Sequence, residues 1–471
     1  MEDKQNLPSA EKIAVTSPYN QELICNLDLT PTTEIYDCLA QMRETFEDPS
    51  EQISLWRRAE ILEDLAQRVE IESENFAYLI AHEGGKPIKD ARIEVARAIQ
   101  GIRYAARHAG EVLAGEAIPD QLNATADAKI FRVLREPIGP VLAISAFNHP
   151  LNLIVHQVIP AVATGCPVMI KPSLSTPLTC LRFIELLHKS GLPTVWANVI
   201  LCTNEVTEKL AADARFAFVS FIGAAKVGWK LRSQLAPGTR CALEHGGNAP
   251  VLMLQDADFK KTIPAILKGG FAHAGQVCVS VQRVYVPYAD AAGFTRALAD
   301  AAERLQVGNP LNDTTDIGPL IRPSEVNRVH SWVQEALAGG AKILKGGDKV
   351  TDTCYKPTIL LDPPKDAKVT KEEVFGPVIC VYGYEDLEEA ITRVNASRYH
   401  FQAAVYGRDM VNVQYVAKRL NASTVMINDP TTFRVDWMPF GGRSHSGLGV
   451  GGIGYTMHEY TQHKLIISPD G

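Results

Sequence analysis

The chain has 471 residues, of which 46% are hydrophobic and 21% charged, and its formal net charge is -7. This length predicts two or three domains, because a single hydrophobic core rarely serves more than roughly 250–300 residues. The negative charge gives no reason to expect nucleic acid or an anionic membrane as a partner. Nine cysteines, an odd number, argue against a secreted disulfide framework and favour a reducing compartment.

One segment has the length of a membrane span. Residues 151–170 contain no Asp, Glu, Lys or Arg, and about 20 predominantly apolar residues suffice to cross a bilayer. Two prolines, a glycine and several polar residues interrupt the segment, so we interpret it as a buried helix followed by a buried strand. The start of the chain, MEDKQNLPSAEK, is polar and lacks the features of a signal peptide. We therefore expect a cytoplasmic protein with no membrane partner.

The N-terminal part has helical patterns. Apolar residues recur at steps of three and four between residues 55 and 69, which predicts a helix that continues to about residue 82. A glycine pair, Gly84 and Gly85, followed by Pro87 is expected to end it. A second helix is expected at about residues 91–108, with Arg97 and Tyr104 on one face.

Beyond Pro137 the texture changes. Short apolar runs (GPVLAISAF, VMIKPS, NVILC, FAFVSFIG) alternate with helical segments at about residues 179–190 and 206–212. This alternation predicts a parallel, doubly wound α/β sheet that binds ligands at the carboxyl ends of its strands. The strand SFIG turns into the helix AAKVGWKL, whose first N–H groups could meet a phosphate. No GxGxxG motif follows these strands in the sequence, which counts against an ordinary Rossmann enzyme.

A second alternation of strands and helices begins after LEHGGNAPVLM. It includes VQRVYVP, GGAKILKGG, YKPTILLDPP and GPVICVYGY, and it predicts a second α/β domain. Between the two domains, residues 116–136 have the pattern of an exposed hairpin. The tail HEYTQHKLIIS reads as a late, isolated strand, and such a strand often pairs with another subunit.

The stretch HAGQVCVS carries one cysteine, Cys278, with no second cysteine within metal-ligand spacing. No metal site is therefore expected here. Taken alone, Cys278 has two readings, a buried filler or a nucleophile, and free cysteines are commonly buried.

Six stretches in order resemble the aldehyde dehydrogenase superfamily over nearly the whole chain. They are SAFNHPLN, IKPS, LEHGGNAP, GGFAHAGQVCVS, EEVFGPV and MPFGGRSHSGLG. The resemblance implies a nicotinamide-binding domain at residues 1–115 and 137–245, which binds its dinucleotide without the usual glycine motif. It implies a catalytic domain at residues 246–453 and a small β oligomerisation element at residues 116–136 and 454–471. A homodimer or homotetramer is the expected assembly.

The same resemblance assigns the catalytic residues. Cys278 matches the nucleophile, which attacks the aldehyde carbonyl to give a thiohemiacetal. Asn148 matches the side chain that, with the backbone N–H of Cys278, holds the developing oxyanion. Glu244 matches the general base that activates water to hydrolyse the thioester. Lys171 is counted with this catalytic set.

Coenzyme binding follows in the same way. Lys171 matches the lysine that reaches the adenosine ribose, and Glu373 and Phe375 match the pair that holds the nicotinamide ribose and ring. The matching turns after two strands add Ser173, Leu174, Gly223 and Ala224 to the expected coenzyme contacts. The family often has a glutamate where this chain has Leu174, and a glutamate would repel a 2′-phosphate. NAD or NADP is therefore expected as coenzyme, because nothing here should exclude NADP.

Several positions that are apolar or aromatic in relatives acting on simple aldehydes are basic here. The four residues are Arg97, His149, His156 and Arg434. Each could instead pair with a local carboxylate, such as Glu94 or Asp436. Together they favour a short anionic or polar aldehyde, because guanidinium groups recognise carboxylate, phosphate and phosphonate. FNHPLN…HQV and FRVDWMPFGG also resemble the lactaldehyde, sulfolactaldehyde and phosphonoacetaldehyde dehydrogenase branch.

Three other functions share some of these sequence features. A coenzyme A-acylating dehydrogenase typically lacks the glutamate that Glu244 matches. A binding or structural protein on the same fold would be expected to lose Cys278, Glu244 or Asn148. A cysteine hydrolase would use the nucleophile without a nucleotide. The free carboxylic acid is therefore the expected product.

Overall fold

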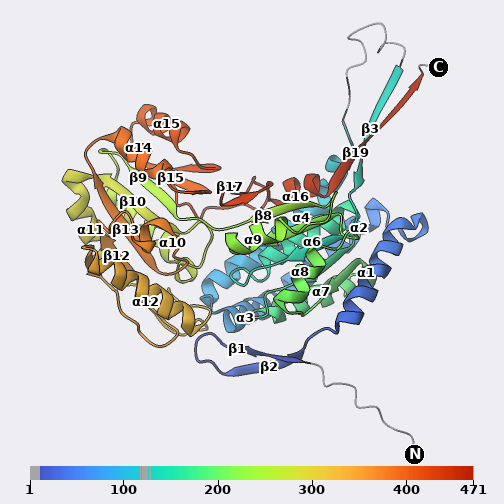
Figure 1. Ribbon diagram of the computed structural model, residues 1–471, viewed down its shortest axis with the longest axis horizontal. Coiled ribbons are helices and arrows are strands. Elements are labelled where there is room, and N and C mark those ends of the chain that lie inside the picture. Colours follow the sequence, from blue (N-terminus) through green and yellow to red (C-terminus); the bar gives the residue numbers. More distant parts are fainter. Residues whose placement is uncertain (1–10, 117, 119–125, 127–128, 470–471) are drawn as a thin grey trace, which may run out of the picture.

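The computed structural model describes residues 11–469 except 117, 119–125 and 127–128. Two α/β regions lie side by side, and a two-stranded arm extends from one of them (Figure 1). A small antiparallel sheet of β1 (Lys12–Thr16) and β2 (Leu23–Asp28) lies near the N-terminus.

The first region contains a six-stranded sheet in the order β18-β8-β7-β4-β5-β6. Every strand is parallel to its neighbours except the edge strand β18. The strands are β4 (Val141–Ile144), β5 (Val168–Lys171), β6 (Ala197–Val199), β7 (Phe218–Ile222), β8 (Arg240–Glu244) and β18 (Gly447–Leu448). The predicted doubly wound sheet is confirmed, and each of the four apolar runs supplies one strand.

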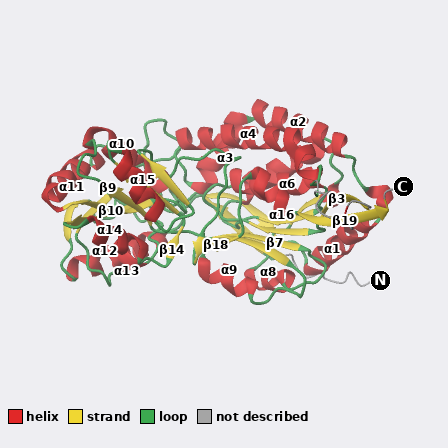
Figure 2. Cartoon of the chain, turned by 90° about the horizontal axis from the view of Figure 1, so that it is seen from above, coloured by secondary structure: helices red, strands yellow, loops and turns green. Residues whose placement is uncertain are grey.

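Helices cover both faces of this sheet (Figure 2). One face is covered by α2 (Leu55–Ile71), α3 (Ser73–Gly84), α4 (Ile88–Leu113), α6 (Asn152–Thr164), α7 (Pro177–Lys189) and α16 (Ile453–Glu459). The other face is covered by α1 (Thr32–Glu47), α8 (Asn204–Ala211) and α9 (Ala225–Arg232). Short 3₁₀ turns occur at η1 (Pro49–Glu51) and η2 (Thr194–Trp196). The charge-free segment 151–170 forms α6 and β5, as expected.

The helix expected from residue 55 to residue 82 is in fact two helices. Helix α2 ends at Ile71, and Glu72 makes the turn into α3. The Glu72 carboxylate accepts hydrogen bonds from Asn75 and Arg182, which hold this turn in place. The spacing of apolar residues could not reveal the break, because the same spacing continues from α2 into α3. The end of α3 is as predicted, with Gly85 in the left-handed conformation at φ 72°.

The second region contains a seven-stranded sheet in the order β11-β12-β13-β10-β9-β15-β16, antiparallel only at β11. The strands are β9 (Ala249–Met253), β10 (Val281–Pro287), β11 (Lys342–Lys345), β12 (Thr358–Leu361), β13 (Val378–Tyr384), β15 (Gln402–Tyr406) and β16 (Thr424–Ile427). The helices are α10 (Phe259–Phe271), α11 (Tyr288–Ala302), α12 (Pro323–Ala338), α13 (Lys368–Lys371), α14 (Leu387–Asn395) and α15 (Met410–Arg419). This is the second α/β unit that the sequence predicted.

The chain returns to the first region near its C-terminus. Two short strands, β14 (Tyr399–His400) and β17 (Arg443–Ser444), pair between the regions, and β18 then joins the edge of the six-stranded sheet. Residues 447–448 therefore lie in the first sheet, although the expected catalytic domain extended to residue 453. Sequence texture cannot reveal this return, because a two-residue edge strand has no periodicity of its own.

The arm consists of β3 (Lys129–Pro137) and β19 (Thr461–Pro469), which pair antiparallel over their full length (Figure 1). The tail strand therefore has a partner within its own chain. Of the hairpin expected at residues 116–136, residues 117, 119–125 and 127–128 lie outside the described residues, and residues 129–136 belong to β3. Among the helices that are described, none is long and apolar enough to cross a membrane.

Candidate active site

A cavity of about 1240 Å³ lies between the two regions. Its wall includes the carboxyl ends of β5, β7 and β8 from the first sheet. The second region contributes the loop around Cys278 and the segment at Glu373. Ligands are expected at the carboxyl ends of parallel strands, so this cavity is the candidate active site.

The loop before Cys278 has an unusual backbone. Within the 3₁₀ turn η3 (Ala272–Gly275), His273 and Ala274 have φ of 49° and 56°, and Gly275 follows at 73°. A Cβ at Gly275 would overlap the carbonyl of Gly376, so only glycine fits this position. Three successive left-handed residues turn the chain sharply out of α10 and bring Cys278 to the cavity wall.

Gln276 fixes this loop from inside. Its side chain donates to the carbonyls of His273 and Pro319 and accepts a hydrogen bond from the N–H of Ile321. The backbone carbonyl of Gln276 accepts a hydrogen bond of 2.9 Å from Nδ2 of Asn148. Asn148 follows β4, so this bond links the first sheet directly to the Cys278 loop.

The surroundings of Cys278 favour its thiol form. Burial, together with the nearby Glu244 and Glu373, raises its pKa to about 12, although Arg434 acts in the opposite direction. The nucleophilic form of cysteine is the thiolate, so attack on a carbonyl requires a base close by. Glu244 is the carboxylate at the end of β8, and burial raises its pKa as well. A carboxyl group with a raised pKa is suited to proton transfer near neutral pH.

Glu373 and Phe375 also line the cavity. The Glu373 carboxylate accepts a hydrogen bond of 3.2 Å from the N–H of Gly247, and burial raises its pKa to about 8. A Cβ at Gly246 would overlap this carboxylate. The Phe375 ring meets the Phe147 ring edge to face, with centroids 5.9 Å apart. Both predicted nicotinamide contacts therefore line the cavity.

The predicted coenzyme residues line one end of the cavity together. They are Lys171, Ser173, Leu174, Gly223 and Ala224. Helix α9 begins after Ala224, which offers no capping side chain, so the positive end of the helix dipole is open to an anion. The Lys171 amine is buried and has no hydrogen bond or ion pair to the described residues. A buried, unpaired ammonium beside a free helix N-terminus fits the ribose and phosphates of a dinucleotide.

The opposite end of the cavity is strongly basic. Arg97, His149 and Arg434 line it, as predicted for a substrate pocket. Both arginines contact Asp436, with Arg97 in a bidentate pair of 2.7 and 3.1 Å and Arg434 at 3.8 Å. The pairing with Asp436 considered from the sequence is therefore present, although Arg434 remains only loosely paired.

His156 does not lie where the sequence placed it. It is buried on α6, outside the cavity wall, and hydrogen-bonds to Asp436 at 2.8 Å. His149 reaches the wall because it precedes the helix, and within α6 only Asn152 and Leu153 at its start line the cavity. His156 is therefore a support for Asp436 rather than a wall residue.

Sequence reasoning missed two groups at this end. Lys86 and Glu94 form a buried ion pair in the wall, and Glu94 also accepts the N–H groups of Leu151 and Asn152 at the start of α6. His273 also lines the wall, and both its ring nitrogens lack a hydrogen-bond partner among the described residues. The sequence feature that could have identified His273 is its position in HAGQVCVS, the stretch that contains Cys278.

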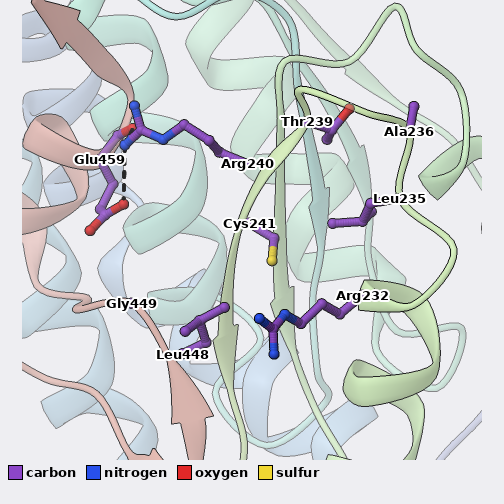
Figure 3. A pocket seen from close by; sticks show the side chains of 9 residues that line it. All are labelled: Arg232, Leu235, Ala236, Thr239, Arg240, Cys241, Leu448, Gly449 and Glu459. Atoms are coloured by element: carbon purple, nitrogen blue, oxygen red, sulfur yellow. Dashed lines mark hydrogen bonds and ion pairs between the residues drawn. The ribbon is translucent and has the colours of Figure 1, made fainter.

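A separate hollow of about 530 Å³ lies beside β8, between α9 and α16 (Figure 3). Arg240 donates to the carboxylate of Glu459 there, and burial raises the pKa of the Cys241 thiol. None of its wall residues faces Cys278 or Glu244. An unactivated thiol and a surface ion pair do not make a catalytic site, so the chemistry belongs to the large cavity.

The geometry described above is a cysteine nucleophile, a buried carboxyl group and a dinucleotide-sized cleft between two α/β regions. A family model described as "Aldehyde dehydrogenase family" matches residues 6–466. The chain belongs to the aldehyde dehydrogenase family, whose enzymes oxidise aldehydes with NAD or NADP as electron acceptor. The recognition made from six sequence stretches is thereby confirmed, as are the fold class and the enzyme class.

Particular relatives sharpen the comparison. The chain is 34% identical over 460 residues to a 3-sulfolactaldehyde dehydrogenase of Priestia aryabhattai, covering 98% of this chain and 95% of the relative. It matches the crystal structure of aldehyde dehydrogenase 21 from Physcomitrella patens in complex with the product succinate, with TM-score 0.94 and 32% identity; 98% and 96% of the chains are covered. It also matches glyceraldehyde-3-phosphate dehydrogenase from Methanocaldococcus jannaschii complexed with NADP. There the TM-score is 0.92 and the identity 33%, with 98% and 100% covered.

Proposed function

We propose that this enzyme oxidises a short aldehyde bearing an anionic or strongly polar group to the free carboxylic acid. The observation that carries the proposal is the pair of arginines, Arg97 and Arg434, in the cavity wall on one side of Cys278. Buried cations that share one carboxylate are costly unless an anion joins them. Two of the relatives, one named 3-sulfolactaldehyde dehydrogenase and one in complex with succinate, support an anionic substrate, and the third is named for a phosphorylated aldehyde.

In the first step, Cys278 attacks the aldehyde carbonyl after giving its proton to Glu244. The carbonyl oxygen becomes an alkoxide, which the Asn148 amide and the N–H of Cys278 stabilise. Donors of this kind typically contribute roughly 100- to 1,000-fold in rate. In the structure the Asn148 amide is held by the Gln276 carbonyl, so its orientation is set before substrate arrives.

Bound NAD or NADP supplies the acceptor for the hydride that leaves the thiohemiacetal, and a thioester on Cys278 remains. Lys171, Ser173 and the start of α9 would hold the ribose and phosphates, and Glu373 and Phe375 would hold the nicotinamide end. Leu174 places no negative charge in this part of the wall, so a 2′-phosphate is tolerated.

Once its first proton has passed to solvent, Glu244 takes a proton from water, which attacks the thioester; the acid leaves, and the departing Cys278 thiolate recovers a proton from Glu244. The Glu244 side chain lies against Gly451, where a Cβ would overlap its carboxyl oxygen. This lack of a side chain leaves the carboxyl group room to serve both the thiol and the water. A coenzyme A-acylating enzyme needs no such base, so Glu244 favours hydrolysis.

An aldehyde panel tests the proposal. Succinate semialdehyde, lactaldehyde, butanal, hexanal and benzaldehyde are compared by the absorbance of the reduced coenzyme, with NAD and with NADP. The anionic and hydroxylated aldehydes should have the highest kcat/KM. Preference for hexanal or benzaldehyde would refute an anionic substrate, and a requirement for coenzyme A would refute hydrolysis.

We also propose a homodimer or homotetramer, with residues 116–136 and 454–471 as the oligomerisation element. Within the arm, Leu465 pairs with Val133 and Ile467 with Phe131, so one face is apolar. Leu465 and Ile467 are about half exposed in the single chain, and this supports burial against a second copy. Light scattering of the full chain should give a dimer or tetramer, and Leu465→Glu/Ile467→Glu should reduce its mass; a monomeric wild type would refute the assembly.

Two further assignments follow from the same scheme. We propose residues 1–115 and 137–245 as the nicotinamide-binding domain and residues 246–453 as the catalytic domain. All nine cysteines lack a disulfide, which supports a reducing compartment such as the cytoplasm.

A further inference from the structure

One buried carboxylate organises the basic end of the cavity. Asp436 is 1% exposed and takes no part in the cavity wall. It accepts hydrogen bonds from Arg97, from Nδ2 of Asn152 at 3.0 Å and from Nε2 of His156 at 2.8 Å, and Arg434 lies at 3.8 Å. These partners come from α4, from α6 and from its own loop.

The charges at this end leave one positive charge uncompensated. Lys86 is matched by Glu94, and the pair is buried. Arg97 and Arg434 share the single carboxylate of Asp436. Elsewhere in the wall, Asp90 and Lys268 have opposite charges, so together they add no net charge.

The imidazole rings of the nearby histidines do not change this net charge. Burial and the neighbouring Arg434 lower the pKa of His156 to about 4, so its ring is neutral near pH 7. A neutral ring that donates from Nε2 to Asp436 has a lone pair on Nδ1, which faces Arg434 at 3.4 Å. Burial also lowers the pKa values of His149 and His273. Glu244 also attracts Arg434, but no ion pair or hydrogen bond joins the two side chains, so Asp436 is the carboxylate that contacts both guanidinium groups.

The uncompensated charge resides on Arg434. Its side chain is 11% exposed, and Nε has no hydrogen-bond partner among the described residues. The guanidinium lies over the ring of Phe440, 3.5 Å from the centroid. The ring provides a cation–π contact but no negative charge, so the guanidinium is held in place without being neutralised.

We propose that Asp436 determines which substrate charge the pocket accepts. Because one carboxylate compensates two guanidinium groups, the pocket selects an aldehyde with one negative charge, such as a carboxylate or sulfonate, over neutral and doubly charged aldehydes. This inference rests on the proposed function and goes further by fixing the number of charges. A second negative charge would find no further uncompensated cation at this end, and Asp436 behind the wall would repel it.

Asp436 would act through the arginines, because it lies outside the wall. Its bidentate contact fixes the plane of the Arg97 guanidinium, and its longer contact leaves the Arg434 guanidinium free to pair with substrate. Asp436 is thus a positioning residue. If its charge sets specificity, removing that charge should change how kcat/KM ranks substrates of different charge. If Asp436 makes only a structural contact, its loss should lower kcat/KM for all substrates alike.

The experiment compares butanal, succinate semialdehyde and 3-phosphonopropanal, at a pH above the second ionisation of the phosphonate. In wild-type enzyme the semialdehyde should have the highest kcat/KM. Asp436→Asn keeps the shape and adds one net positive charge, so it should raise the ratio of kcat/KM for phosphonopropanal over semialdehyde about tenfold, mainly through KM.

The double variant Arg97→Met/Asp436→Asn removes one charge of each sign and should return this ratio toward the wild-type value. Asp436→Glu should keep the wild-type ranking. Should Asp436→Asn fail to fold, the double variant and Arg97→Met carry the test. Arg97→Met alone removes the net positive charge, so kcat/KM for succinate semialdehyde should fall about tenfold relative to kcat/KM for butanal.

If Asp436→Asn leaves the ratio of kcat/KM for phosphonopropanal over semialdehyde unchanged, Asp436 does not set the accepted charge. If only Arg97→Met folds, an unchanged ratio of kcat/KM for semialdehyde over butanal overturns the charge-setting role in the same way. In that case a wild-type preference for the semialdehyde over butanal still leaves the proposed function standing. A wild type that prefers butanal to both anions defeats the proposed function itself. The two failures are therefore distinguishable.

Discussion

The two ends of the cavity around Cys278 are built in different ways. The end that we propose for the coenzyme consists of turns after parallel strands and the start of α9, so the backbone can supply binding groups there. The substrate end consists of charged side chains from α4, from the loop before α6 and from the loop at Arg434. Helices α4 and α6 and the loop at Arg434 are far apart in the sequence and meet at Asp436.

This difference predicts where substitutions act strongly. A backbone-built site depends little on any one side chain, because N–H groups and the helix dipole remain after substitution. A site built from buried charges depends on each partner, because removing one leaves another uncompensated. The largest effects should therefore occur at Cys278 between the ends, then at the substrate end, and the smallest at the coenzyme end.

Cys278→Ala should remove the chemistry while both ends remain intact. We expect a loss of dehydrogenase turnover of at least roughly 1,000-fold, since the covalent route disappears. Coenzyme affinity, measured by fluorescence titration, should stay within about twofold. The other eight cysteines provide controls, and turnover within tenfold of wild type would exclude Cys278 as the nucleophile.

Glu244→Gln should separate the two halves of the reaction. Hydrolysis of the thioester needs a base, and a positioned base typically contributes roughly 100- to 10,000-fold. Rapid-mixing measurements should show a burst of reduced coenzyme that is slower than in wild type, because Glu244 also takes the thiol proton, followed by turnover that is slowed still more. Burial raises the pKa of Glu244, so in wild type the rate of hydrolysis should fall as the pH falls through this raised value. Equal loss of burst and turnover would place Glu244 in thiol activation alone.

Arg434→Met should impair the substrate end selectively. Loss of a buried cation that faces an anionic substrate should lower kcat/KM for succinate semialdehyde more than about tenfold. The KM for coenzyme should not change. Arg103→Met is a matched control, because Arg103 pairs with Glu70 on the exposed side of α4, where ion pairs contribute little. Equal kinetics in both variants would contradict the assigned role of Arg434.

Leu174→Glu should have the smallest of these effects. A carboxylate in this part of the wall repels a 2′-phosphate, so the NADP/NAD ratio of kcat/KM should fall by about tenfold, or about 1.4 kcal/mol. Leu174→Gln has the same size without the charge and should leave the ratio near the wild-type value. If wild type shows no turnover with NADP, another contact controls the coenzyme.

The coenzyme end was the easier of the two to predict from sequence. Strands and the turns that follow them have local patterns, and Gly223 and Lys171 stand directly after apolar runs. The fold of both sheets followed from the same alternation. The return of β18 to the first sheet was not predictable, because it depends on a long-range pairing of two residues with β8.

The substrate end was predictable only in part. The basic residues stood out by type, but their roles depend on depth within the structure. His156 is one helical turn into α6 and packs behind the wall, whereas His149 precedes the helix and reaches it. Asp436 was considered only as a local partner, since no sequence pattern shows that α4, α6 and its own loop converge on one carboxylate.

The left-handed backbone before Cys278 has an evolutionary consequence. His273 and Ala274 occupy a conformation that costs a residue with a side chain about 1–2 kcal/mol and that glycine adopts freely. Glycine at either position should therefore raise the melting temperature, although at position 273 it would remove a ring that lines the cavity. A lineage selected only for heat resistance would drift towards glycine here, and retention of the imidazole would record selection for what the pocket does with it.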